Sequence, residues 1–161
     1  MNIYNDVENL EALPEGRILG IDYGSKRIGL AMSDPSQFLA STLETLPNDK
    51  QTMHRLKMLI EEHAVQLVVV GKPLHMNGTA GESAEKAAKL AEKVSQISRV
   101  PVVMWDERWT TKSAENLYRQ TGRSASRQRN KIDQVAAAYL LQSFLDRLCG
   151  LKQQRKQQKE N

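Results

Sequence analysis

Cysteine and histidine are scarce in this sequence of 161 residues. The only cysteine, Cys149, has no partner for an intrachain disulfide and no CxxC neighbour for zinc, which is typical of a protein from a reducing compartment. His54 and His63 fall in a predicted helix without partners at ligand spacing, and His75 fits a loop position, either solvated or against a phosphate. Any bound metal is therefore expected to take oxygen ligands.

Long apolar runs are also absent. No stretch approaches the length of a membrane span, and residues 1–16 contain neither an apolar run nor a basic leader. We therefore expect a cytoplasmic protein without a membrane partner. A hydrophobic fraction of 40% over 161 residues suits one globular domain, and the chain is too short for two full ones.

The formal net charge of +4 is distributed unevenly along the chain. The first segment is acidic, with Asp6, Glu8, Glu11 and Glu15. A later segment holds basic residues with no acid between them: Arg119, Arg123, Arg127, Arg129 and Lys131. Such a cluster indicates a polyanionic partner, although a solvated loop or helix face would show the same composition.

The chain is expected to divide into an arm, a domain and a tail. Residues 1–16 lack periodicity and end in Pro14 and Gly16, so they are expected to form an arm ahead of the domain. Residues 17–149 would form the domain. Residues 150–161 are rich in Lys, Gln and Arg and are expected to be a disordered basic tail.

The apolar pattern within the domain predicts an α/β fold. Two apolar runs around Gly24 and Ser25 predict a β-hairpin, and a third strand is expected between residues 38 and 46. Helical and strand patterns then alternate: helix 49–63, strand 65–70, helix 81–97, strand 102–105, helix 110–120 and a final amphipathic helix from about 132 to 148. This order predicts a mixed central sheet that opens with a hairpin and has helices packed on both faces.

Asp22 is unusual for its position, because it lies in an apolar strand where an unpaired carboxylate would be costly to bury. Strand alternation puts Asp22 on the same side as Gly20 and opposite Ile21, so the side with the acid has room for a ligand or an ion. A cap on the following turn, through the amides of Gly24 or Ser25, would also explain the acid.

Further acids lie at the end of a predicted strand and the start of a predicted helix. Asp106 and Glu107 follow the strand 102–105, at the end where open α/β sheets bind ligands. Neighbours on a strand face opposite sides, so only one of the two is expected to face Asp22, while the other pairs with Arg108 or caps the next helix. Asp133 is predicted in the first turn of the last helix, where the helix dipole also favours an acid.

Three carboxylates on separate elements suit Mg²⁺, which takes oxygen ligands and is often held by one or two protein carboxylates plus substrate phosphates. Two such ions can activate a water, bind the scissile phosphate and stabilise the leaving oxygen in an in-line displacement. The pattern therefore favours phosphodiester hydrolysis that requires no serine, cysteine or histidine nucleophile.

Four segments resemble, in order, the YqgF family of Holliday-junction-resolvase-like nucleases. They are GIDYGSKRIGLAMSD (20–34), VVGKPLHMNG (69–78), DERWTT (106–111) and KIDQVAA (131–137). The resemblance covers roughly residues 17–147. It implies a ribonuclease-H-like fold and a part in maturing the 5′ end of 16S ribosomal RNA precursors. The family's acidic positions fall on Asp22, Glu107 and Asp133, so the resemblance selects Glu107 over Asp106.

The chain departs from the family pattern at three positions. Lys72 stands where the family usually has leucine, Asn77 where aspartate is common, and Trp109 where leucine is common. The first two make the site more positive, which would strengthen contact with a phosphate backbone or change the nucleic acid accepted. The substrate is expected to contact basic side chains, namely Lys72, Arg108, Arg123, Arg127, Arg129 and Lys131.

The leading hypothesis is hydrolysis of precursor ribosomal RNA, with the three acids as Mg²⁺ or Mn²⁺ ligands. The protein is expected to be a monomer or a homodimer, and to bind the nucleic acid alone or within a pre-ribosomal particle. A resolvase of four-way DNA junctions would use two symmetric sites in a dimer. A non-catalytic assembly factor would use the basic surface alone. The opening motif also resembles the phosphate loop of actin-like ATPases and sugar kinases, but these need two lobes of ~150 residues or more each.

Overall fold

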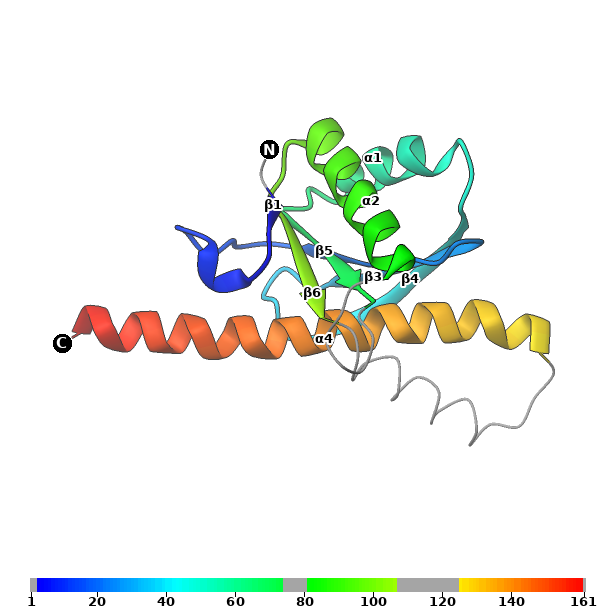
Figure 1. Ribbon diagram of the computed structural model, residues 1–161. Coiled ribbons are helices and arrows are strands. Elements are labelled where there is room, and N and C mark those ends of the chain that lie inside the picture. Colours follow the sequence, from blue (N-terminus) through cyan, green and yellow to red (C-terminus); the bar gives the residue numbers. More distant parts are fainter. Residues whose placement is uncertain (1–2, 74–80, 107–124, 161) are drawn as a thin grey trace.

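The computed structural model describes residues 3–73, 81–106 and 125–160, with the helical backbone but not the side chains of residues 125–134. Its centre is a six-stranded sheet with the order β1-β6-β5-β2-β3-β4 (Figure 1). The strands are β1 (Ile3–Tyr4), β2 (Ile18–Asp22), β3 (Arg27–Ser33), β4 (Ala40–Pro47), β5 (Leu67–Lys72) and β6 (Val102–Asp106). The helices are η1 (Val7–Asn9), α1 (Thr52–Glu62), α2 (Glu82–Ser98) and α4 (Ala125–Glu160).

The sheet is mixed, as predicted. Strands β2, β3 and β4 are antiparallel neighbours, whereas β2, β5, β6 and β1 run parallel to one another. The opening hairpin requires a glycine at its turn, because a Cβ on Gly24 would lie 2.2 Å from the Arg27 carbonyl oxygen. Because β2, β5 and β6 are parallel and adjacent in the sheet, their carboxyl ends lie side by side at one edge.

Helices cover both faces of the sheet, which confirms the predicted architecture. On one face, α1 and α2 pack on side chains such as Leu19 and Ile21 of β2. On the other face, α4 packs on Ile18 and on the opposite sides of the neighbouring strands. Figure 1 shows α1 and α2 above the sheet and α4 passing below it. Alternation along β2 therefore assigns each of its residues to one of two separate cores.

The N-terminal segment is not an arm outside the domain. β1 extends the sheet by pairing with β6, Ile3 opposite Val102, and Val7 and Leu10 are buried in the core beneath α4. The expectation failed because the segment has only a few apolar residues, and their partners lie about a hundred positions later in the sequence.

The expected disordered tail is instead the last part of α4, which continues to Glu160. Leu151 is buried there, and the Lys152 ammonium donates to the Pro14 carbonyl at 3.0 Å and to Gln37 Oε1 at 2.6 Å. Arg155 donates to backbone carbonyls of the N-terminal segment, 3.0 Å from that of Leu10. These two basic side chains tie the tail to the N-terminal segment, and Figure 1 shows η1 next to the C-terminal part of α4.

The loop between β3 and β4 joins this contact. Asp34 accepts hydrogen bonds from the amides of Leu39, Phe38 and Ser36. These bonds, of which the one from Leu39 has the largest effect, hold the pKa of the Asp34 carboxyl below its usual value. Gln37, buried within the same loop, donates to the Pro14 carbonyl at 2.9 Å. The loop therefore presents Gln37 in a fixed position to both ends of the chain.

Replacing Arg155 by alanine is expected to destabilise the fold by about 1 kcal/mol, because three backbone carbonyls lose a charged donor at a partly exposed position. Urea unfolding followed by circular dichroism measures the change. Lys159→Ala, at an exposed position in the next turn of the same helix, is the matched control and should leave the midpoint unchanged. Equal midpoints for both variants would contradict a stabilising role for Arg155.

No helix among residues 3–73, 81–106 and 125–160 is long and apolar enough to cross a membrane.

Candidate active site at the carboxyl edge of the sheet

Three polar residues end the parallel strands at this edge: Asp22 on β2, Lys72 on β5 and Asp106 on β6. The register pairs Ile21 with Val70 and Lys72 with Asp106, so the three strands end at nearly the same level. The carboxyl edge of parallel strands is where open α/β sheets bind ligands. The structure thus places the first predicted ligand at an edge suited to a site.

Asp22 lies on the face of the sheet that α4 covers. Alternation from Ile21, in the opposite core, puts Asp22 on the same side as Gly20. At Gly20 the helix comes so close that a Cβ would lie 2.9 Å from Leu141 Cβ and 3.5 Å from the Ala137 carbonyl oxygen. Glycine at position 20 therefore lets α4 approach β2 directly beside the acid. The space that the sequence alternation predicted for a ligand or an ion is, at Gly20, filled by α4.

The helix α4 runs antiparallel to β2 along this contact. Lys152 meets Pro14, ahead of the strand, whereas Leu141 and Ala137 meet Gly20 within it. Two residues further along β2 is Asp22, a rise of about 6.6 Å, and one turn earlier in α4 is Asp133, a rise of about 6 Å. The backbone register thus brings Asp133 to the level of Asp22, on the same face of the sheet.

Asp133 is not in the first turn of its helix, contrary to the sequence prediction. The helix begins at Ala125, so Asp133 lies more than two turns inside it. The favourable effect of a helix dipole on an acid is confined to the first turn. The dipole therefore does not account for an acid at position 133, and the alternative explanation drawn from the sequence is wrong.

Asp106 lies on the face away from Asp22. Trp105 packs in the core under α4 and Met104 in the core under α1 and α2, so alternation puts Asp106 on the α1–α2 face. Trp105 also fixes the end of β6 to α4, since its Nε1 donates to Ser143 Oγ at 2.9 Å. Asp106 therefore does not share a face with Asp22. Glu107, the alternative favoured by the resemblance, lies outside the described residues.

Among the predicted substrate contacts, only Lys72 has a described side chain. It ends β5, and alternation from Val70 puts it on the α1–α2 face. Arg127, Arg129 and Lys131 lie in α4, but their side chains are not described. The remaining predicted positions lie outside the described residues: Arg108, Arg123, His75, Asn77, Trp109 and the helix expected at 110–120.

The residues present at this edge fit a hard divalent cation. Asp22 supplies carboxylate oxygens on a face without a bulky neighbour on its own strand, and Mg²⁺ and Mn²⁺ prefer such ligands. Within the part of the chain whose side chains are described, no three His, Cys, Asp or Glu side chains form a metal-binding group. Of the three predicted ligands, only Asp22 belongs to that part.

The architecture is that of the resolvase type of ribonuclease-H-like fold. It is similar to *Thermus thermophilus* RuvC in complex with a Holliday junction substrate, with a TM-score of 0.53, 20% identity, and coverage of 83% of this chain and 96% of that one. It is also similar to the fowlpox virus resolvase bound to Holliday junction DNA, with a TM-score of 0.51, 14% identity, and coverage of 82% and 98%. At these identities the likeness concerns the fold.

The sequence narrows this class to one family. The sequence model of the RuvX family, described as Holliday junction resolvase, matches residues 16–147. The chain therefore belongs to this family. It is the same family that the motifs resemble and that is also called YqgF. Relatives named "Putative pre-16S rRNA nuclease" include a *Ruminiclostridium cellulolyticum* protein, 40% identical over 139 residues, covering 84% of this chain and 98% of that protein. A *Desulforamulus reducens* protein of the same name is 41% identical over 132 residues, with 81% and 96% covered.

Proposed function

We propose that this protein is a metal-dependent nuclease that hydrolyses phosphodiester bonds, and that it processes the 5′ end of the 16S ribosomal RNA precursor in the cytoplasm. The observation that supports the proposal is the position of Asp22 at the carboxyl end of β2, on the face of the sheet that α4 covers. Relatives that match most of this chain are named as nucleases of 16S ribosomal RNA precursors, and this supports the choice of RNA as the substrate.

In this proposal the chain's own side chains bind the metal and orient the substrate. Asp22, Glu107 and Asp133 would hold Mg²⁺ or Mn²⁺ from three separate elements, and Gly20 lets α4 pack closely on β2 beside the first of them. A bound divalent ion supplies positive charge for the scissile phosphate and lowers the pKa of a water that attacks it. The basic residues Arg108, Arg123, Arg127, Arg129 and Lys131, together with Lys72, orient the strand through its phosphates.

Incubating the purified protein with end-labelled precursor RNA, duplex DNA and a four-way DNA junction tests the proposal. We expect cleavage of the RNA with Mg²⁺ or Mn²⁺ and none with chelator, because the proposed ligands are carboxylates. The products are resolved on a sequencing gel. Cleavage that persists in chelator would contradict the metal-dependent site, and binding of RNA without cleavage would favour a non-catalytic assembly factor.

The family description favours resolution of DNA junctions as the second candidate. Paired cuts across a junction need two sites related by symmetry, which a homodimer would supply. Sedimentation of the protein with and without junction DNA separates the candidates. Symmetric cuts by a dimer, with the RNA left intact, would replace the first proposal by the second.

A further inference from the structure

A second feature of the carboxyl edge lies on the face opposite Asp22. There the structure forms a cavity of about 210 Å³ between α2, the loop from β4 to α1, and the residue that follows β2. Three of its lining residues are lysines of α2: Lys86, Lys89 and Lys93. Tyr23, Asn48 and Asp49 line the other side. We call this cavity the α2 lysine cleft.

The charge of the α2 lysine cleft is positive. The three lysines are spaced three and four residues apart, which places them on one face of the helix, and all three are exposed. Among the described residues that line the cleft, Asp49 is the only one with a carboxylate, and it accepts a hydrogen bond from the Gln51 amide at 2.8 Å. Lys86 also meets Glu82 at 3.2 Å, but an exposed pair of this kind contributes little. The cleft therefore suits an anion.

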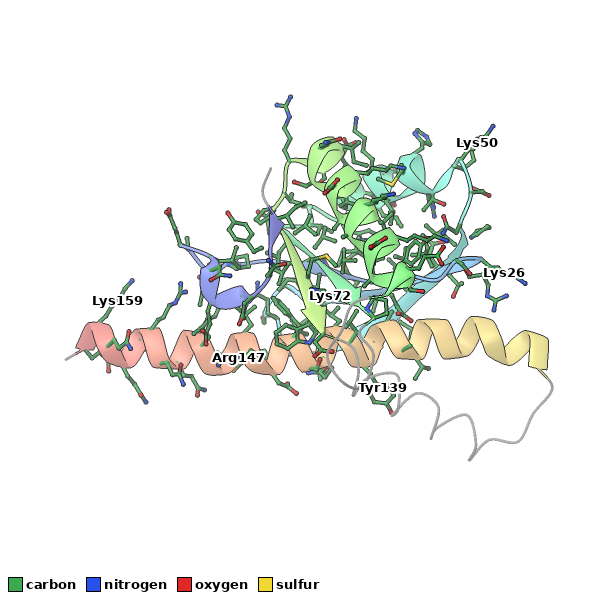
Figure 2. All side chains as sticks on the ribbon, viewed as in Figure 1. Lys26, Lys50, Lys72, Tyr139, Arg147 and Lys159 are labelled. Atoms are coloured by element: carbon green, nitrogen blue, oxygen red, sulfur yellow. The ribbon has the colours of Figure 1, made fainter. Side chains whose placement is uncertain are left out.

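The wall opposite α2 is held in place by the backbone. The Asn48 amide donates to the Lys26 carbonyl at 2.9 Å, and its side-chain nitrogen donates to the Gly24 carbonyl at 3.0 Å. These bonds tie the β4–α1 loop to the β2–β3 turn. Lys26 and Lys50 lie on the two connected loops, at the same end of the molecule (Figure 2), and extend the positive charge beyond the cleft.

The cleft is adjacent to the candidate active site along the chain. Tyr23 lines it and directly follows Asp22, and the two residues belong to opposite faces of the sheet. A polymer that crosses the carboxyl edge at β2 would reach both. The partly buried ring of Tyr23 offers a surface for a base, whereas the lysines match phosphates.

We propose that the α2 lysine cleft binds phosphates of the nucleic-acid strand at a distance from the bond that is cut. The inference rests on the proposed function, since it supplies that function with a second contact for the same substrate. The ligand is a polynucleotide backbone, and the contact is independent of base sequence because ammonium groups bind phosphates rather than base edges.

The test is a triple variant, Lys86→Gln, Lys89→Gln and Lys93→Gln, whose binding to labelled precursor RNA is followed by fluorescence anisotropy in chelator over a salt series. Losing three phosphate contacts should make the slope of log K against log salt shallower by about 2, and affinity at low salt should fall about tenfold or more. The thermal midpoint should stay unchanged, because the lysines are exposed.

The matched control is Lys57→Gln, Lys156→Gln and Lys159→Gln, which removes the same charge at exposed positions outside the cleft. It should keep the wild-type slope. An unchanged slope in the first variant, or an equal change in both, would overturn the proposal. A cleft built for a free nucleotide would instead bind a nucleoside monophosphate or pyrophosphate in a lysine-dependent way and leave RNA affinity unaltered, which would also overturn it.

The design separates this inference from the proposed function, because binding is measured without cutting. Lysine-dependent RNA binding by a protein that cuts nothing would support the cleft and contradict the nuclease. Cleavage of RNA, together with a salt dependence of binding that stays the same when the three lysines are replaced, would support the nuclease and contradict the cleft.

Discussion

Replacing Asp22 by asparagine should reduce metal-dependent cleavage about a thousandfold or more while the protein stays folded. The substitution keeps the size of the side chain but removes the negative charge that would hold the cation. A Lewis-acid ion contributes several kcal/mol to stabilising the transition state, and each 1.36 kcal/mol is a factor of ten in rate. Single-turnover cleavage of precursor RNA measures the loss, and calorimetric titration with Mn²⁺ should show weakened binding.

Asp106→Asn is the matched control for this experiment. Asp106 ends β6, a parallel strand separated from β2 by β5, at the same edge, yet alternation puts it on the opposite face of the sheet. It carries the same charge change, and its cleavage rate should stay within a few-fold of the wild type. Retained cleavage by Asp22→Asn would remove Asp22 from the site. Equal losses of cleavage rate in both variants would show that the rate depends on the total charge at this edge, and would contradict the role of Asp22 as a specific metal ligand.

Most of the central fold could be predicted from the sequence, because its elements have strong periodicity. The predicted helix 81–97 corresponds to α2 at Glu82–Ser98, and the strand 102–105 to β6 at Val102–Asp106. In α2 the alanines and Val94 recur at helical spacing, and in β6 a short apolar run follows a proline. Local patterns of this kind decide an element before its neighbours are known.

The two ends of the chain could not be predicted in this way. Residues 1–15 and 148–161 lie outside the family match. In the described parts of these segments, Lys152 and Arg155 bind backbone carbonyls of the N-terminal segment, and β1 pairs with the distant strand β6. Leu10 is buried, and its carbonyl accepts a bond from Arg155, 145 positions later. A window of a dozen residues contains no sign of such a partner. A polar helix and a short edge strand therefore resemble disorder when each is considered alone.

The candidate site was predictable in part. The acid within an apolar strand, with a small residue two positions before it, singled out Asp22. The structure gives another reason for the small residue than the predicted space for a ligand, because α4 needs Gly20 to approach β2. The lysines of α2 were overlooked because glutamates such as Glu85 and Glu92 are interspersed with them, a pattern that also fits a solvated helix. Only the placement of the β4–α1 loop opposite them forms a cleft.

Phe144→Ala should be the most destabilising single substitution proposed for α4, lowering the free energy of unfolding by about 3–5 kcal/mol. The side chain is fully buried, and its ring meets that of Trp105 edge to face, with centroids 5.4 Å apart and planes at 88°. Truncation would leave a cavity between α4 and β6. Because domains of this size are stable by roughly 5–15 kcal/mol, a large share of the total would be lost.

Tyr139→Ala is the control, since Tyr139 is an aromatic residue of the same helix, 40% exposed, and points away from the sheet (Figure 2). It should change stability by about 0.5 kcal/mol or less. Urea unfolding monitored by far-ultraviolet circular dichroism compares both with the wild type. If Phe144→Ala costs no more than Tyr139→Ala, α4 does not depend on its buried face, and the proposed metal site shared by Asp22 and Asp133 loses its support. A large loss confined to Phe144→Ala would instead show that the contact of α4 with the sheet is a fixed one, as a metal site shared between them requires.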